Sequence, residues 1–334
     1  MMHEVFIQPI QPYSSNHQLR HIGYELEFAG IDLKTTGRII AHALDGQWQV
    51  LSEAEGRVTT DTGTFKVEID WQFAKTTARQ RIAQRTLEQG TTKAEDPLME
   101  WMTKLATVVV PVEVICPPLT VEQLQLLHPM ITQLRENGAL GTGSSLRYAF
   151  GVHINPELPS YDSATIIAYL QSFIICQQWL VEHHQVDLMR RVTPYINFYP
   201  ERYNKLVMNY QGNESLPHII HDYLKYNATR NRALDLLPLF MFLEPEQVSI
   251  QLDDPLIHAR PTLHYRLPNC EIERPEWDLA QSWNTWCVVE QIANTPSLRN
   301  TLIEQWLNDN HLINRYSEHI WQQLDTIHRD LLSA

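Results

Sequence analysis

Apolar and polar residues alternate along several short stretches in the first half of the chain, which is the pattern of strands with one buried face. The stretch 21–28 (HIGYELEF) shows it most clearly, because every even-numbered residue from Ile22 to Phe28 is apolar. The same alternation, or a run of β-branched residues, predicts further strands in this half of the chain. These strands cover residues 47–51, 57–61, 64–70, 107–115 and 146–154.

Helical periodicity dominates the rest of the chain, where apolar residues recur every three to four positions. The predicted helices cover residues 76–106 (interrupted at Gly90 and Pro97), 121–136, 163–185, 216–226, 229–242, 277–293, 297–308 and 313–332, and one late strand covers 263–267. Strands that cluster early and helices that cluster late favour an α+β fold with a largely antiparallel sheet. Residues 1–19 have no clear period and are interpreted as a lead-in segment, and residues 20–334 as a single domain with a helical C-terminal part.

Composition and charge narrow the range of partners. Apolar residues make up 43% of the 334 positions, enough for a core that needs no disulfides. The formal net charge is −13, so phosphate backbones and anionic membranes are disfavoured as partners. The cysteines are widely spaced, without a C-x-x-C pair, and no secretory signal or run of 18 apolar residues is visible. We therefore expect a cytoplasmic protein without a membrane span.

Carboxylates occupy alternate positions of the predicted strands. Glu25 and Glu27 lie two residues apart, so both side chains project from the face opposite Tyr24 and Leu26. Other strands offer the same kind of side chain: Glu68 with Asp70, Glu113, and His153 with Asn155. Neighbouring carboxylates repel unless a cation separates them, and Mg²⁺ prefers oxygen ligands. The pattern is compatible with a magnesium site and also with acids on a solvated sheet face, because one sequence does not show that the strands face one site.

Other motifs are interpreted more conservatively. The glycine-rich residues 141–145 (GTGSS) lack a following G-K-[ST], so we expect a plain loop. Arg190 and Arg191 are expected to pair with surface acids, and the histidine pairs 183–184 and 218/221 have no H-E-x-x-H context. Trp283 and Trp286 are expected to fill the helical core. No G-x-S-x-G or G-x-G-x-x-G motif supports a serine hydrolase or a dinucleotide-binding fold.

An ordered set of segments resembles the amidoligase family, whose members are related to glutamine synthetase and glutamate–cysteine ligase. The segments are 21–28 (HIGYELEF), 58–61 (VTTD), 112–119 (VEVICPPL), 151–155 (GVHIN), 227–232 (NATRNR) and 260–269 (RPTLHYRLPN). The resemblance covers roughly residues 20 to 290. One departure from the family pattern is Asn155, which stands where many members have the second histidine of H-x-H and so leaves the number of metal ions open.

The resemblance implies a glutamine synthetase-like fold, with a catalytic concave sheet face and helices packed on the other side. It implies ATP and Mg²⁺ as cofactors. Glu25, Glu27 and Glu113 match the metal ligands of the family, and the strand pattern adds Glu68. The remaining matches are His153 with Asn155 for metal or phosphate, Arg266 for the transferred phosphate, and Arg230 for a phosphate or carboxylate.

The implied activity is an ATP-dependent ligase that joins a small-molecule or peptide carboxylate to an amine through an acyl phosphate. Phosphoryl transfer requires positioning and charge neutralisation, which paired acids with magnesium and an arginine supply. The alternative is a non-catalytic binding protein that keeps the fold. A glycosidase with paired carboxylates is a third possibility. The two substrates and the oligomeric state are left open by the sequence.

Overall fold

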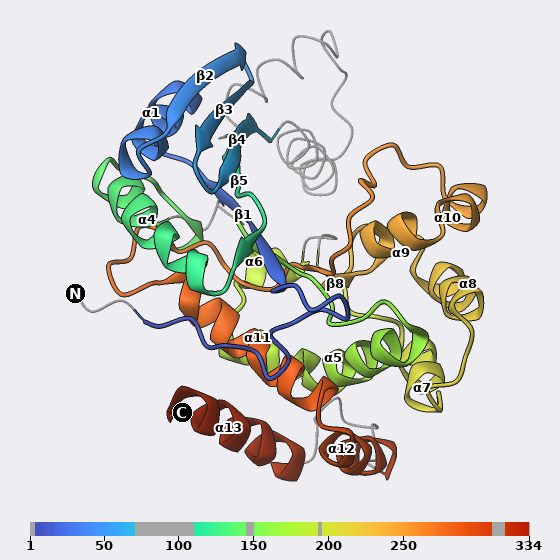
Figure 1. The fold of residues 1–334 in the computed structure, drawn as a ribbon. Helices are drawn as coiled ribbons and strands as arrows, with labels where there is room; N and C mark the ends of the chain where they lie inside the picture. Colours follow the sequence, from blue (N-terminus) through green and yellow to red (C-terminus); the bar gives the residue numbers. More distant parts are fainter. Residues whose placement is uncertain (1–3, 71–109, 145–149, 193–195, 309–317, 334) are drawn as a thin grey trace, which may run out of the picture.

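The computed structural model describes residues 4–70, 110–144, 150–192, 196–308 and 318–333. Across these residues one nine-stranded sheet forms the centre of the molecule (Figure 1). Its strands follow the order β2-β3-β4-β5-β1-β7-β9-β8, and β6 pairs with β1. Every strand pair in the described sheet is antiparallel. The strands are β1 His21–Phe28, β2 Gln47–Ser52, β3 Glu55–Thr60, β4 Gly63–Ile69, β5 Val112–Ile115, β6 Leu119–Thr120, β7 Val152–Pro156, β8 Leu234–Asp235 and β9 His264–Tyr265.

Helices pack beside and beneath this sheet. They are α1 Leu33–Ala43, α4 Leu127–Glu136, α5 Ser163–His183, α6 Leu188–Val192, α7 Glu201–Met208, α8 Leu216–Asn227, α9 Leu237–Leu243, α10 Pro245–Gln251, α11 Leu279–Ala293, α12 Pro296–Asn308 and α13 Glu318–Ser333. Short 3₁₀ turns cover Glu122–Leu126 and Thr142–Ser144. The expected α+β class with a mostly antiparallel sheet is therefore confirmed, and the expected helix 76–106 lies outside the described residues.

The apolar face of the central strands is covered by α5 and α11. Tyr24 of β1 is fully buried, and its hydroxyl donates to the Leu279 carbonyl at the start of α11. Tyr265 of β9 packs against Trp286 of α11, with 4.8 Å between ring centroids, and against Phe173 of α5. Burial of these large side chains on one face leaves the alternate residues of each strand on the opposite face. The expectation that tryptophans of 277–293 fill the core is confirmed by Trp286.

Helix α5 is long and apolar enough to cross a membrane by length and composition alone. Of its most apolar 18-residue window, however, 83% is buried inside the protein. Such burial is the property of a central core helix, because a core helix in a large domain is apolar around most of its circumference. Trp179 and Phe173 of α5 are fully buried in this way.

The lead-in segment packs along α11. Phe6 is buried, the Ile7 amide donates to Asn284 at 2.9 Å, and the Ile7 carbonyl accepts a hydrogen bond from Trp283 at 2.7 Å. Arg20, the residue before β1, forms a buried ion pair with Glu290 of α11 at 2.7 Å. These contacts connect the start of the chain to the helix that covers the apolar face of β1.

One predicted helix is wrong in part, and the helices α1, α6, α7 and α10 were not predicted. The helix expected over 229–242 begins only at Leu237, and the preceding Leu234–Asp235 forms strand β8 instead. Pro238 lies in the first turn of α9, where a proline is tolerated, whereas further inside a helix it would break the backbone hydrogen bonding. Helix α1 was not expected at all, although Asp32 caps it by accepting a hydrogen bond from the Thr35 amide at 2.9 Å.

Candidate functional site

Three carboxylates lie side by side across the polar face of the sheet. The strand register places Glu27 of β1 opposite Glu113 of β5, and Glu113 opposite Glu68 of β4. Side chains directly opposite each other on antiparallel strands lie close together. The acids that the sequence placed on separate strands therefore form one continuous carboxylate row, the name used below for Glu27, Glu113 and Glu68.

The carboxylate row is electrostatically strained. Burial, together with repulsion from Glu25 and Glu27, raises the pKa of Glu113 well above its ordinary value, and Asp70 and Glu68 add to the effect. The Glu27 carboxylate accepts a hydrogen bond from the Gly151 amide at 2.8 Å and interacts with the charge of Arg190. A cation between these carboxylates would relieve the repulsion.

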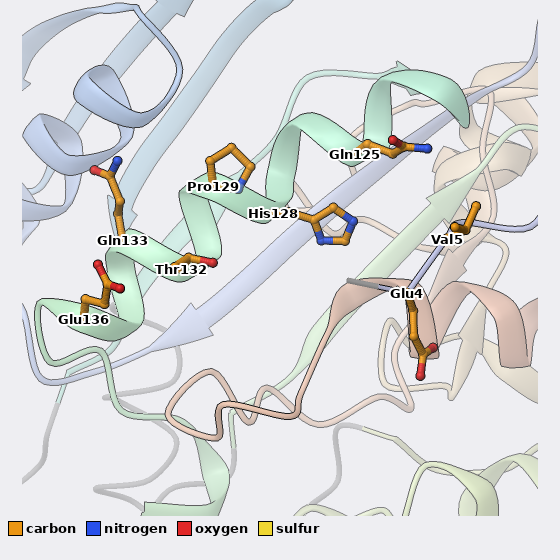
Figure 2. Close-up of a pocket in the computed structure, with 8 residues that line it drawn as sticks. All are labelled: Glu4, Val5, Gln125, His128, Pro129, Thr132, Gln133 and Glu136. Carbon is orange, nitrogen blue, oxygen red and sulfur yellow. The ribbon is translucent and has the colours of Figure 1, made fainter. Parts of the chain in front are cut away.

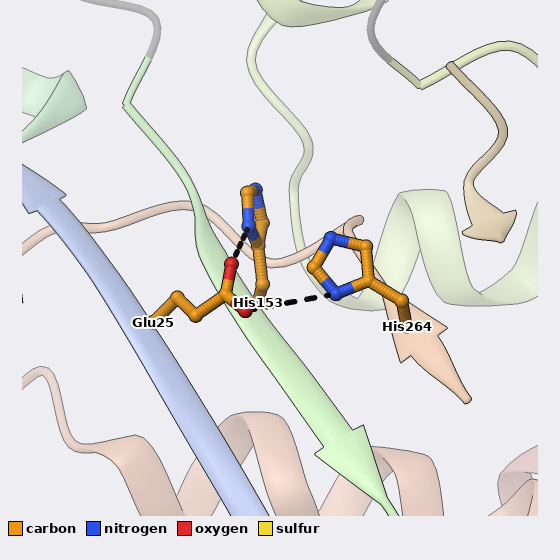
Figure 3. A group of neighbouring side chains, drawn as sticks. All are labelled: Glu25, His153 and His264. Atoms are coloured by element: carbon orange, nitrogen blue, oxygen red, sulfur yellow. Dashed lines mark hydrogen bonds and ion pairs between the residues drawn. The ribbon is translucent and has the colours of Figure 1, made fainter. Parts of the chain in front are cut away.

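Beside the row, Glu25 is the centre of a polar network on β1, β7 and β9. His153 of β7 lies opposite Glu25 in the register, and its Nδ1 is 3.0 Å from Glu25 Oε2. Asn155 donates to Glu25 Oε1 at 3.1 Å, and Arg260 Nη1 donates to the same oxygen at 2.6 Å. Figure 3 shows the carboxylate of Glu25 between the rings of His153 and His264, whose Nδ1 is 3.9 Å from Oε1.

The protonation states in this network follow from its contacts. Burial would raise the pKa of Glu25, but His264, His153 and Arg260 outweigh burial and hold it well below its ordinary value, so the carboxylate is ionised. Burial and the nearby Arg266 guanidinium lower the pKa of His264, and the charge of Glu25 opposes this shift. An ionised carboxylate only accepts hydrogen bonds, so the Nδ1 atom of His153 is the donor in its contact with Glu25.

The other ring nitrogen of His153, Nε2, lies on the side of the carboxylate row. His153 Nε2 is 3.8 Å from Glu27 Oε1, too far for a hydrogen bond and wide enough for an ion about 2 Å from each atom. A histidine that binds a metal commonly donates its other N–H to a carboxylate, as His153 does to Glu25. The donor atoms of Glu27, Glu113 and His153 lie within 4.8 Å of one another, so this group fits a divalent cation.

A second group, Glu25 with His153 and His264, satisfies the same distance condition and is buried. Its donor atoms are already engaged within the protein, because His264 Nδ1 lies 2.5 Å from the Asn155 amide oxygen and Glu25 is bonded by Arg260. The second group is therefore compatible with a metal ion only after some of these contacts are exchanged. A single neutral imidazole ligates one ion at a time, so His153 would serve one of the two groups.

Arginines gather at the β8–β9 end of the polar face. The Arg266 Nη2 atom is 3.7 Å from Asp235 Oδ2, and Arg230 Nε donates to Asp254 at 2.9 Å. Burial raises the pKa of Asp235 to about 6, opposed by the charges of Arg266, Arg230 and Arg260, which all act on this carboxyl. The buried Nε of Arg266 has no hydrogen-bond partner among the described residues. The sheet thus presents carboxylates at its centre and guanidinium groups beside them.

The sequence of the chain matches that of a protein family described as "Putative amidoligase enzyme" over residues 18–288. The chain is a member of the amidoligase family. The resemblance noted in the sequence is thereby confirmed, and with it membership in a family of amide-forming ligases that act on small molecules. A search of the curated proteins found no match.

The matched range of this amidoligase contains every residue predicted for the site. The structure brings together Glu27, Glu113 and Glu68 in one row, and Glu25, His153 and Asn155 in the adjoining network. Arg266 lies at the same face through its contact with Asp235, whereas Arg230 pairs with Asp254 and is partly exposed. What each side chain does in catalysis stays a prediction.

Sequence reasoning missed several members of the site. Arg260, in the family-like segment 260–269, had no assigned role; His264, two residues before Arg266, was expected on the same functional side of the strand but also had no assigned role. Asp235 was hidden inside an incorrectly predicted helix. The expected surface pairing of Arg190 is wrong, because Arg190 is buried. Its guanidinium donates to the carbonyls of Leu267 and Pro268 at 2.6 and 2.7 Å, and of Arg266 at 2.7 Å.

Arg190 also explains why residue 151 is a glycine. A Cβ atom at Gly151 would lie 2.5 Å from Arg190 Nη2 and 3.4 Å from His153 Nε2. Because Gly151 has no side chain, there is space for the Arg190 guanidinium, which donates to the backbone carbonyls that follow β9. Thr142–Ser144 of the glycine-rich loop form a 3₁₀ turn, and the Gly141 amide donates to Glu273 at 2.8 Å; residues 145–149 lie outside the described range.

A hollow of about 600 Å³ lies away from this polar face. It is formed by α4 and the first described residues of the chain, with His128 and Glu136 among its lining side chains (Figure 2). The Nδ1 atom of His128 lies 3.1 Å from Asp278 Oδ2. None of the predicted site residues lines this hollow, so the candidate site is the polar face of the sheet and not the hollow.

Proposed function

We propose that this amidoligase is an ATP- and Mg²⁺-dependent carboxylate–amine ligase that forms an amide through an acyl phosphate. The observation that supports it most is the Glu27–Glu113–His153 group, whose donor atoms lie within 4.8 Å of one another on the polar face of the sheet. Carboxylate oxygens are the ligands that Mg²⁺ prefers, and the strained row gains from a bound cation. The arginines beside it are suited to bind phosphate or carboxylate oxygens.

In this proposal each side chain has a defined role. Glu27, Glu113 and His153 would hold Mg²⁺, with Glu68 completing the carboxylate row and Glu25 orienting His153 through its hydrogen bond. Bound Mg²⁺ would supply neutralisation of the charge on the phosphate oxygens. Arg266 would contact the transferring γ-phosphoryl group, where a planar guanidinium grips two oxygens.

The chemistry runs in two balanced steps. The substrate carboxylate oxygen attacks the γ-phosphorus of ATP, the bond to the bridging oxygen breaks, and ADP leaves. The nitrogen of the deprotonated amine then attacks the acyl carbon, and inorganic phosphate leaves with the electron pair of the C–O bond. Arg230, at the same end of the sheet as Arg266, would contact the phosphate or the carboxylate of the substrate.

Thermal unfolding tests this proposal. ATP with Mg²⁺ should raise the melting temperature and EDTA should remove the increase, because a ligand at 100 times its Kd stabilises the native state by about 2.7 kcal/mol. Glu27→Gln should abolish most of the increase while the apo protein stays folded. The matched control is Glu136→Gln, which removes one acid from the exposed end of α4 and should leave the increase intact.

Phosphate release then separates an enzyme from a non-catalytic binding protein. The assay supplies ATP, Mg²⁺ and a mixed pool of carboxylates and amines. Release that requires both substrate classes supports the ligase. Binding of nucleotide and Mg²⁺ without release under any combination of carboxylates and amines would favour the non-catalytic alternative, and the absence of both would contradict the proposal.

A further inference from the structure

Arg260 occupies a position at which a cation would otherwise sit. It lies between α10 and β9, and its backbone amide is fixed by the Pro238 carbonyl. Its Nη1 atom donates to Glu25 Oε1 at 2.6 Å, and its Nη2 atom is 3.5 Å from His264 Nδ1. The guanidinium therefore touches two members of the Glu25–His153–His264 group, which is compatible with a metal ion by its geometry.

The two candidate cation groups differ in this respect. Arg260 donates directly from a charged guanidinium to Glu25, whereas the Glu27 carboxylate accepts a hydrogen bond from the neutral Gly151 amide and interacts with the charge of Arg190. A divalent ion beside a guanidinium is repelled by it, and both would compete for the same carboxylate oxygen. Of the groups bonded to Glu25, Arg260 is also the most exposed, with 34% of its side chain accessible, so it can be rehydrated when it moves.

We propose that Arg260 and a divalent cation exclude each other at Glu25, so that a cation binds the Glu25–His153–His264 group only when the guanidinium leaves the carboxylate. This inference rests on the proposed function, since it takes the polar face to be a cation site. Arg260 is then a positioning residue that balances the charge of Glu25 in the cation-free protein. The two groups share His153, so a cation that binds the Glu27–Glu113–His153 group leaves Glu25 and His264 as the remaining residues of the second group.

After displacement from Glu25, the Arg260 guanidinium is available to bind an anion. Arg260 acts on the Asp235 carboxyl together with Arg266 and Arg230, so these three arginines share one region at the β8–β9 end of the sheet. The buried Nε atoms of Arg260 and Arg266 both have no hydrogen-bond partner among the described residues. A cation that frees Arg260 from Glu25 therefore adds a donor to a region already suited to an anion, which couples cation binding to anion binding.

Calorimetric titration with Mn²⁺ alone tests the exclusion, with the metal-bound population counted independently by electron paramagnetic resonance. The variants are Arg260→Gln and the matched control Arg230→Gln, which removes the same charge from an arginine that pairs with Asp254. Arg260→Gln should strengthen the weaker class of Mn²⁺ sites by about tenfold or more, and Arg230→Gln by much less. Equal Mn²⁺ affinities in wild type and Arg260→Gln, or a weaker affinity in the variant, would overturn the inference.

A second variant covers the possibility that Arg260→Gln does not fold. Arg260→Lys keeps the charge on a shorter side chain without the planar fork, so its hold on Glu25 is weaker. It should strengthen the same class of sites by a smaller factor, and an unchanged affinity in Arg260→Lys would overturn the inference as well. Mn²⁺ binding in wild type with no response to either variant rejects the role of Arg260 alone. No Mn²⁺ binding in any folded form rejects the cation site itself.

Discussion

Replacement of Glu113 by glutamine should stabilise the cation-free protein while it abolishes stabilisation by Mg²⁺. Glu113 lies between Glu27 and Glu68 in the strand register, and its carboxyl has a pKa well above the ordinary value because of burial and repulsion from neighbouring carboxylates. Glutamine keeps nearly the same shape and removes the charge. In most surface positions such a change has little effect on stability, so a clear increase would identify a strained site.

The magnitude follows from the distance between the acids. The donor atoms of Glu27 and Glu113 lie within 4.8 Å, at which two unit charges repel by about 0.9 kcal/mol at the dielectric constant of water and about 3.5 kcal/mol at an effective value of 20. Glu113 keeps some solvent exposure, so a gain of about 1–2 kcal/mol is expected for the variant. This corresponds to an increase of a few degrees in melting temperature.

The gain should depend on pH in a defined direction. Because the pKa of Glu113 is raised in the folded protein, the unfolded chain loses this proton first as pH rises. The wild type therefore loses stability as pH rises from the ordinary glutamate pKa through the raised one, and the variant does not. The difference between Glu113→Gln and wild type should be small at pH 5 and largest at pH 8.

Urea unfolding at pH 5 and pH 8, with EDTA and with saturating Mg²⁺, measures each of these quantities. At pH 8 the variant should be the more stable protein in EDTA and the less stable one in Mg²⁺. Glu136→Gln should show neither effect. A Glu113→Gln protein that is less stable than wild type in EDTA at pH 8 would show that the carboxylate row is not strained, and the reasoning about the cation would lose its basis.

Two further substitutions test the proposed role of Arg266 and the stability of the folded protein at low pH. Arg266→Lys keeps the charge but loses the two-oxygen grip, so kcat for phosphate release should fall by about tenfold or more, with the Kd for nucleotide little changed; turnover at the wild-type rate would show that Arg266 is structural. Burial lowers the pKa of His184 to about 3, and its Nε2 atom lies 2.7 Å from the Tyr265 hydroxyl. The unfolded chain therefore takes up a proton at His184 before the folded protein does as pH falls below about 6.5. His184→Gln should therefore reduce the loss of unfolding free energy between pH 6.5 and 4.5 by up to about 1.4 kcal/mol per pH unit, as read from urea midpoints; identical slopes in the two proteins would contradict the shift.

The central strands could be predicted from the sequence because their signal is local. Alternation in 21–28 assigns Glu25 and Glu27 to one face, and the structure places both there, opposite the buried Tyr24 and Leu26. The carboxylate row depends additionally on strand order and register, which alternation within one strand does not contain. The sequence thus indicated the residue types of the site but not that Glu113 lies between two other acids.

The arginine side of the site was less accessible to prediction for a physical reason. Strand β8 has only two residues, too few for alternation to be recognised, and Asp235 was assigned to a helix, whereas β9 lies within the strand predicted over 263–267. Arg190 is buried because backbone carbonyls of Leu267 and Pro268 accept its hydrogen bonds, a long-range arrangement without a local signature. Helix α1, by contrast, had a readable signal in the Asp32 cap and was overlooked.

Anomalous X-ray scattering from crystals grown with Mn²⁺ and a non-hydrolysable ATP analogue tests the central claim most directly. The account predicts a Mn²⁺ peak within bonding distance of Glu27 and Glu113, with His153 Nε2 as the nitrogen ligand and the γ-phosphate facing Arg266. A peak at the Glu25 group would be accompanied by separation of Arg260 from Glu25. Crystals with the nucleotide bound elsewhere and no Mn²⁺ on the polar face of the sheet would contradict the account.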